Sequence, residues 1–334
     1  MKMEERIVAF SALGKLIEQL SEDEFQSLAE EVRRENPWFT EANVRMAVSG
    51  ISKFLNKEKL QVWVSSYTFN NTLKKVALIM AGNIPMVGFH DLLCVLISGH
   101  QALIKLSSKD SVLIKFLVHK LIDLSPQFEN KIEFVERLKD FDAVIATGSD
   151  NSARYFDYYF GKYPNIIRKN RTSIGVLKGN ESDEELTALG IDVFSYFGLG
   201  CRNVSKLFVP NGYDLGKIYR SWEKYHDIVH HHKYCNNYDY QKSILLVNTS
   251  PFLDNGFVIF QENEKMVSPI SVVYYEFYNS TSELNERLST LKEKTQCIVG
   301  NSEWSNIKFG QSQFPELGDY ADQIDTLSFL SKLS

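Results

Sequence analysis

The residue best suited to covalent chemistry is Cys201, in the stretch FGLGCRNV at residues 197–204. Gly198 and Gly200 lie close to it, and glycine lets a backbone adopt positive φ or approach a ligand closely. Cysteine is the most nucleophilic side chain near neutral pH, so we predict that Cys201 attacks an acyl carbon and carries it as a thioester. A free cysteine taken alone is more often an inert core residue, so the rest of the chain must decide between these interpretations.

Polar residues that could bind a nucleotide follow three apolar runs. These runs, at residues 76–80, 102–106 and 143–146, alternate with helical patterns and predict a parallel α/β sheet. Ligands bind such sheets at the carboxyl ends of the strands. The polar residues at those ends are Asn83, Lys105, Ser107, Ser108, Thr147, Gly148 and Ser149.

The turn at residues 147–149 allows two interpretations. It precedes a predicted helix, whose N–H groups could hold a phosphate. The serine could equally be a simple helix cap in an ordinary loop. Three polar loops in succession favour a nucleotide, although the GxGxxG dinucleotide fingerprint is absent from the chain.

The remaining segments must position these residues. The first seventy residues predict a helical arm, with a capping box at Ser21 and Glu24 that starts a helix over residues 22–35. We predict a loop or a segment that contacts a ligand at residues 236–240, and further strands at residues 174–177, 206–210, 243–247 and 271–277. No repeat or flexible linker is visible, so the domain break is placed in the turn near residues 169–172.

Composition excludes several functional classes. The 334 residues carry a net charge of −5, which argues against a nucleic-acid surface, and no run approaches the ~20 apolar residues that span a membrane. The N-terminus shows no secretory signal, and four cysteines form neither a disulfide framework nor a zinc pattern. The histidines at 226 and 230–232 do not converge easily on one ion. We therefore expect a cytoplasmic protein with free thiols and no metal.

The order of these motifs resembles the aldehyde dehydrogenase superfamily and, within it, the LuxC-type acyl-CoA reductases. The resemblance covers residues 75–322, and the segments at 82–85, 102–107, 146–149, 200–210, 234–243 and 309–330 carry it. It implies a parallel-sheet cofactor domain with the helical arm at residues 1–170 and an α/β catalytic domain at 171–305. Residues 306–334 would then return to the cofactor domain and supply an oligomerisation strand near 325–330.

The resemblance also implies residue roles. Asn83 would donate to an oxyanion, Cys201 would be the nucleophile, and Glu262 or Glu264 would hold the nicotinamide ribose. Of these two glutamates we predict Glu264. The cofactor contacts would come from Lys105 at the adenosine ribose, with Ser107 and Ser108 beside it, and from Thr147, Gly148 and Ser149 at the pyrophosphate.

Two departures from the superfamily pattern are informative. Arg168 stands where a glutamate would activate water, and a cation cannot deprotonate water, so hydrolysis of an acyl-cysteine should be slow. Ser108, next to Lys109, replaces the carboxylate that grips the adenosine 2′-hydroxyl, which removes repulsion towards a 2′-phosphate. NADPH is thus at least as suitable as NADH. Arg168 and Arg202 are candidates for contacts with CoA phosphates.

These observations lead to one function and three alternatives. We expect NADPH-dependent reduction of an acyl-CoA, with a fatty acyl chain, to the aldehyde through a thioester on Cys201. A reductase of acyl phosphates, a reductase of acyl groups delivered by a partner protein, and a non-catalytic nucleotide-binding relative remain open. We also expect a homo-oligomer.

Overall fold

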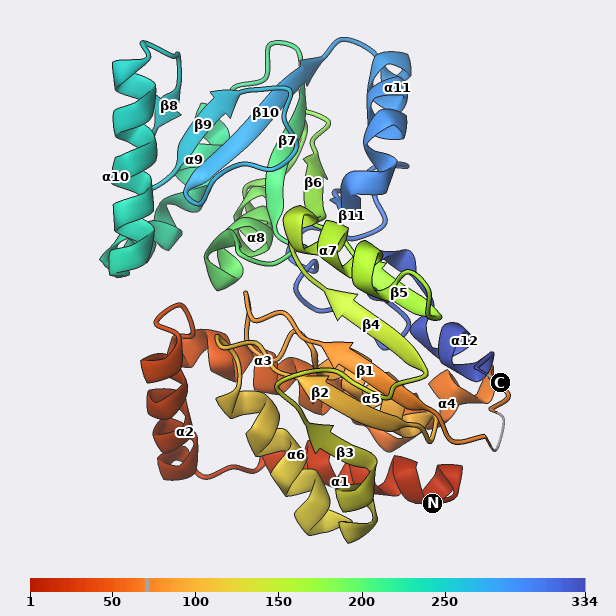
Figure 1. The fold of residues 1–334 in the computed structure, drawn as a ribbon. Coiled ribbons are helices and arrows are strands. Elements are labelled where there is room, and N and C mark those ends of the chain that lie inside the picture. Colours follow the sequence, from red (N-terminus) through yellow and green to blue (C-terminus); the bar gives the residue numbers. More distant parts are fainter. Residues whose placement is uncertain (70–71, 334) are drawn as a thin grey trace. The chain divides into compact units, whose positions relative to one another are not determined.

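The computed structural model describes residues 1–69 and 72–333, which form two compact units. Unit 1 comprises residues 1–170 and 315–334, and unit 2 comprises residues 171–314. Figure 1 shows both units with their helices and strands labelled. The segment 306–334 is therefore divided, with its first residues in unit 2 and the rest in unit 1. The functional names given to the domains stay predictions.

Unit 1 begins with the predicted helical arm. Its helices are α1 (Met3–Glu18), α2 (Glu22–Glu35), α3 (Glu41–Phe54) and α4 (Lys57–Ser65). The predicted capping box is confirmed, because Ser21 Oγ accepts from Glu24 N and the Glu24 carboxylate accepts from Ser21 N. The apolar stripe of α1 is buried throughout, at Ile7, Phe10, Leu13 and Ile17.

The core of unit 1 is a five-stranded parallel sheet in the order β3-β2-β1-β4-β5. The strands are β1 (Lys75–Ile79), β2 (Gln101–Lys105), β3 (Ile132–Phe134), β4 (Ala143–Thr147) and β5 (Asn165–Arg168). The elements between them are α5 (Phe89–Ile97), α6 (Val112–Leu124), the 3₁₀ helix η1 (Pro126–Lys131) and α7 (Asp150–Phe160). Strand order reverses between β1 and β4, which is where open α/β sheets bind ligands.

The C-terminal segment of unit 1 corrects one prediction. Residues 325–330, expected as an oligomerisation strand, lie almost wholly in helix α12 (Thr326–Ser331), which follows the 3₁₀ helix η5 (Ala321–Gln323). The Asp325 carboxylate accepts from Ser328 N and so caps this helix. A short apolar run has no periodicity that distinguishes a strand from a helix. The aspartate that caps the segment is the residue that indicates a helix.

Unit 2 contains a six-stranded sheet in the order β11-β6-β7-β10-β9-β8, in which β8 alone is antiparallel to its neighbour. Its strands are β6 (Thr172–Val176), β7 (Val204–Pro210), β8 (Leu253–Asp254), β9 (Ile259–Glu262), β10 (Val272–Tyr278) and β11 (Thr295–Val299). Its helices are α8 (Asp183–Phe194), η2 (Ser195–Gly198), α9 (Gly216–Trp222), η3 (Glu223–His230), α10 (His232–Val247), α11 (Thr281–Leu291) and η4 (Lys292–Lys294).

Helix α10 corrects two further predictions, because it contains both the expected loop at 236–240 and the expected strand at 243–247. The residues that α10 buries are Tyr234, Tyr238 and Leu245, spaced by four and seven positions along one helix face. Because polar residues separate these three positions, the helical periodicity of the buried side chains was not recognised in the sequence. The predicted strand at 206–210 is confirmed within β7.

Candidate active site

Cys201 lies in a short loop between η2 and β7, in unit 2, where its side chain is partly exposed. Three successive residues before it adopt left-handed backbone, with φ of 51° at Tyr196, 58° at Phe197 and 77° at Gly198. Glycine tolerates this conformation, but for Tyr196 and Phe197 it costs about 1–3 kcal/mol each. The residues around the loop must therefore hold this conformation in place.

The buried side chain of Asn203 supplies much of that support. Its Nδ2 donates to the carbonyls of Asp192, at 3.1 Å, and Ser195, at 2.8 Å, at the end of α8. Its Oδ1 accepts from Gly200 N at 2.8 Å, and its own N–H donates to Gly200 O at 3.0 Å. One amide thus fixes both sides of the loop. We did not predict this role, because Asn203 stands in a turn, where asparagine is common, and therefore gives no signal of its own.

Strand β6 holds the same loop from its other side. Ser173 Oγ donates to Cys201 O at 3.1 Å, and Ser173 N donates to Asn203 O at 3.1 Å. Thr172 Oγ1 also donates to Asn203 O, at 3.2 Å. The backbone at residues 200, 201 and 203 is therefore anchored on side chains and strands, so Cys201 is presented from a rigid turn.

Asp192 and Arg202 connect this loop to residues 310–312. The Asp192 carboxylate, which is fully buried, accepts from Gly310 N at 2.6 Å and Ser312 N at 2.8 Å. Burial raises the pKa of Asp192, while these hydrogen bonds and the charge of Arg202 oppose the increase. Arg202 Nε donates to Ser312 O at 2.5 Å, so the predicted CoA contact already has a structural bond in unit 2.

The predicted ribose contact Glu264 lies in the irregular segment after β9, and its side chain is exposed. Its backbone carbonyl accepts from Arg287 Nη2 at 2.8 Å. Glu262, the other candidate, is the exposed last residue of β9.

The predicted residues in unit 1 gather at the carboxyl edge of its sheet. Lys105 is the exposed last residue of β2, and Asn83 is exposed in the turn after β1. A Cβ on Gly82 would lie 2.5 Å from Ser107 Oγ, so the loops after β1 and β2 touch where glycine alone fits. Ser107 is partly exposed, and Ser108 and Lys109 are exposed, so this edge carries hydroxyl groups together with the cations of Lys105 and Lys109.

The turn after β4 confirms the helix cap, and phosphate binding at the same turn stays a prediction. Ser149 is the N-cap of α7, and its Oγ accepts from Ser152 N at 3.3 Å. Thr147 and Gly148 are partly exposed beside it. Because β4 and β1 flank the reversal of strand order, this helix N-terminus stands at the position that favours a dinucleotide phosphate.

Arg168 is placed differently from the other predicted residues. It is 4 % exposed, forms an ion pair with the buried Asp91, and donates from Nη2 to Thr326 Oγ1 at 2.9 Å. Its charge is thus neutralised inside unit 1, between β5, α5 and α12. A buried and paired Arg168 is not available to a CoA phosphate, so we do not propose it as a CoA contact.

One residue of the histidine-rich segment at 226–232 contacts the turn that precedes Cys201. The ring of His231 stacks on that of Phe197, with centroids 4.3 Å apart. Within residues 1–69 and 72–333, no group of three or more His, Cys, Asp or Glu side chains is placed to hold a metal ion. Across the same residues, no helix combines the length and apolar character needed to cross a membrane.

Comparison with known proteins gives one family and one fold. A family model described as acyl-CoA reductase (LuxC) matches residues 15–210. No curated protein matches the chain.

Aldehyde dehydrogenases are among the solved structures that are similar to this one. A Bacillus cereus enzyme in complex with NAD+ is 15 % identical, with a TM-score of 0.64 over 92 % of this chain and 72 % of that one. Aldehyde dehydrogenase 21 from Physcomitrella patens, with succinate bound, is 12 % identical, with a TM-score of 0.66 over 99 % and 84 %. An aldehyde dehydrogenase C mutant from Pseudomonas syringae, with NAD+ and octanal, is 12 % identical, with a TM-score of 0.64 over 90 % of this chain and 72 % of that one. This likeness shows the aldehyde dehydrogenase-like fold.

Proposed function

The chain belongs to the LuxC acyl-CoA reductase family, and we propose that it reduces an acyl-CoA to the aldehyde with NADPH through a thioester on Cys201. The family and the fold support an oxidoreductase that acts on acyl groups or aldehydes. The CoA thioester, the fatty acyl chain, the choice of NADPH and the covalent intermediate are the parts that we propose.

The observation that carries this proposal is the position of Cys201 among the four cysteines. Cys94 and Cys297 are buried, and burial raises the pKa of the Cys94 thiol well above its ordinary value. Cys235 is partly exposed, but it lies on α10, and its pKa is raised by desolvation and by the Asp239 carboxylate, to which its Sγ donates. Cys201 alone of the four combines an accessible thiol with a loop held rigid by buried polar groups.

The proposed reaction begins when the Cys201 thiolate attacks the thioester carbonyl. The Cys201 N–H and the Asn83 side chain donate to the developing oxyanion, and each such donor is worth about 3 kcal/mol in comparable sites. The tetrahedral species collapses, CoA leaves as its thiolate, and Cys201 holds the acyl group. A reduced nicotinamide dinucleotide, when bound, supplies hydride to that carbon. Release of the aldehyde then restores the Cys201 thiolate.

The residues that would hold the dinucleotide fit its chemistry. Its diphosphate would meet the α7 N-terminus at Ser149 with Thr147 and Gly148, and its adenosine ribose would meet Lys105 and Ser107. Glu264 would accept from the nicotinamide ribose hydroxyls. A carboxylate to activate water is replaced by the ion-paired Arg168, so reduction is favoured over hydrolysis to the acid.

Ser108 provides a direct test of cofactor choice. A carboxylate at this exposed position would repel a 2′-phosphate and accept from a 2′-hydroxyl. We expect Ser108→Glu to lower the ratio of kcat/KM for NADPH to that for NADH about tenfold or more, which is a change of about 1.4 kcal/mol. Equal ratios in the variant and the parent protein would contradict the assignment of Ser108 to the adenosine ribose.

The assay of function is acyl-CoA-dependent oxidation of NADPH and NADH across CoA thioesters of increasing chain length. We expect turnover that Cys201→Ala abolishes, while the matched control Cys235→Ala, which removes another partly exposed thiol in unit 2, retains it. Turnover with an acyl phosphate or an acylated carrier protein, and none with CoA thioesters, would show that the substrate is that acyl donor and not an acyl-CoA. Full activity in Cys201→Ala would refute the covalent mechanism.

A further inference from the structure

The connection between β9 and β10 in unit 2 is unusual for parallel strands. These strands pair in parallel, and such pairs are normally joined through a crossover that contains a helix. Here the nine residues between Glu262 and Val272 contain no helix. Their backbone groups therefore need partners other than those that a helix provides.

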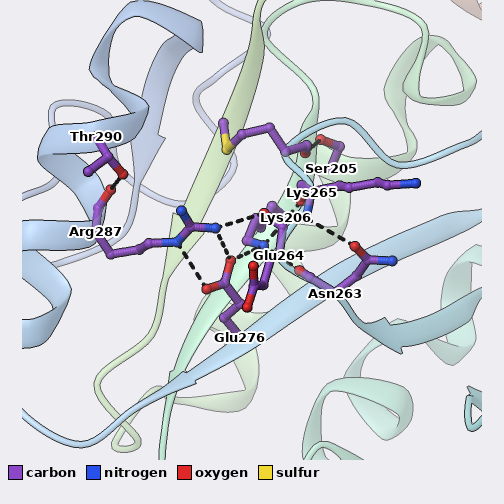
Figure 2. Close-up of polar contacts among 9 residues, drawn as sticks. Ser205, Lys206, Asn263, Glu264, Lys265, Glu276, Arg287 and Thr290 are labelled. Atoms are coloured by element: carbon purple, nitrogen blue, oxygen red, sulfur yellow. Dashed lines mark hydrogen bonds and ion pairs between the residues drawn. The ribbon is translucent and has the colours of Figure 1, made fainter.

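Side chains supply those partners to four consecutive carbonyls, as Figure 2 shows. Lys206 Nζ donates to Asn263 O at 2.5 Å and to Lys265 O at 3.1 Å. Arg287 Nη2 donates to Glu264 O at 2.8 Å, and Ser205 Oγ donates to Met266 O at 2.9 Å. The segment 263–266 is thus held at every residue.

Two cations and one carboxylate form the centre of this arrangement. The Lys206 side chain is fully buried, and its three N–H donors meet the two carbonyls and the Glu276 carboxylate. Arg287 binds the same carboxylate through Nε, at 3.1 Å, and Nη2, at 3.0 Å. Burial lowers the pKa of Lys206, while the hydrogen bond and charge of Glu276 oppose that decrease.

Stability alone is a poor explanation for this cluster. Apolar residues of similar volume are often as stabilising as a buried ion pair, since taking charges out of water is costly. What the cluster adds is a fixed backbone, because each cation points at particular carbonyls of residues 263–265.

Strand β7 connects this segment to the nucleophile loop. Ser205 and Lys206 follow Cys201 by four and five residues, on the strand that the loop enters. The same crossover continues to Ser268 and Pro269, which line a small crevice together with Gly198 of that loop. The loop that carries the reactive thiol therefore leads directly into the strand whose side chains bind the carbonyls of residues 263, 265 and 266.

We propose that Lys206 and Arg287 are positioning residues that hold the backbone of residues 263–266 and thereby place the Glu264 carboxylate for the dinucleotide. This rests on the proposed function, in which Glu264 binds the nicotinamide ribose. Lys206 and Arg287 act through Glu264 and do not themselves touch the ligand. Their loss therefore weakens the use of the dinucleotide and leaves transfer of the acyl group to Cys201 intact.

The test uses Arg287, which is partly exposed and therefore less needed for folding than Lys206. We expect Arg287→Met to raise the Kd for NADPH, measured by fluorescence titration, about tenfold, with partial rescue in Arg287→Lys. Acylation of Cys201 by an acyl-CoA without dinucleotide, followed by intact mass, should stay within twofold of the parent protein. The matched control is Arg220→Met, because Arg220 pairs with Asp214 on the surface of the same unit. We expect it to change neither quantity.

A double variant separates positioning from a general loss of structure. Glu264→Gln should raise the Kd for NADPH by itself, and adding Arg287→Met should increase it little further, because both act through one carboxylate. Lys206→Met should raise the Kd at least as much as Arg287→Met, with its melting temperature recorded alongside. An unchanged Kd in Arg287→Met, or additive effects with Glu264→Gln, would overturn the inference. Absence of acylation in the parent protein would instead refute the proposed function, and the Kd comparison would still decide the inference.

Discussion

The loops at the carboxyl edge of the unit 1 sheet and the loop of Cys201 in unit 2 are built in opposite ways. The first set carries exposed polar groups, such as Lys105, Ser108 and Ser149. The second is strained at Tyr196 and Phe197 and is held by buried side chains. Polar groups that face solvent can complete their bonding with a ligand, whereas the Cys201 loop is satisfied before any ligand arrives.

This difference separates recognition from chemistry. A binding loop loses one contact when one hydroxyl is removed, and neighbouring contacts still orient the ligand. A reactive turn needs its geometry within about 0.5 Å, so loss of one supporting side chain displaces the nucleophile itself. Substitutions in unit 2 should therefore have larger effects on activity than comparable substitutions at the unit 1 edge, with the exception of Asn83, the proposed oxyanion donor.

The largest effect is expected for Asn203→Ala. It leaves the carbonyls of Asp192 and Ser195 and the Gly200 N–H without this partner, and each buried group left unsatisfied costs about 1–3 kcal/mol. We expect kcat/KM to fall more than 100-fold and the urea midpoint to decrease. Asn211→Ala removes an exposed asparagine that bonds Asn279 and should retain both properties. A near-normal kcat/KM in Asn203→Ala would contradict the claim that the Cys201 loop depends on its supporting side chains.

A smaller effect is expected at Ser149, where capping and phosphate binding can be separated. Asparagine and aspartate are both good helix caps, so Ser149→Asn and Ser149→Asp should keep the melting temperature within a few degrees. Aspartate adds a negative charge beside the proposed diphosphate, and we expect it to raise the KM for NADPH about tenfold, with a smaller increase for Ser149→Asn. Equal KM values for the two variants would show that Ser149 is a cap and nothing more.

The smallest effect on activity is expected for Asp110, which holds a unit 1 loop by accepting from Met86 N at 2.7 Å and whose ionisation should change stability instead. Burial raises the pKa of Asp110 from 3.8 to about 8. Between these two pH values the folded state keeps the proton on Asp110, whereas the unfolded state releases it. The free energy of unfolding should therefore fall as pH rises from 4 to 8, by at most about 1.4 kcal/mol per pH unit.

Asp110→Asn supplies the matched comparison, because its amide oxygen can still accept from Met86 N and it does not titrate. The difference in unfolding free energy between variant and parent, from urea titrations, should grow with pH in favour of the variant. A constant difference between pH 4 and 8 would show that Asp110 is ionised in the folded protein. Activity at pH 7 should change little, because the asparagine keeps the hydrogen bond that holds Met86 N.

Sequence alone predicted the family, the parallel sheet of unit 1 and the capping box at Ser21, because apolar runs and capping residues are local signals. It failed for α10 and α12, where short apolar runs gave no usable period. The support of the Cys201 loop was also beyond it. Asn203 and Lys206 act on carbonyls that are 8 to 59 residues away, and only the folded backbone brings these groups together.

The most direct test of the account is whether Cys201 carries the acyl group. The protein is mixed with a fatty acyl-CoA without dinucleotide, and intact mass, peptide mapping and released CoA are measured. We predict one acyl group on Cys201 for each CoA released, stable until NADPH or NADH is added and then lost as the aldehyde. An acyl group on another residue, or aldehyde formation with no adduct in the parent protein and undiminished turnover in Cys201→Ala, would contradict the account.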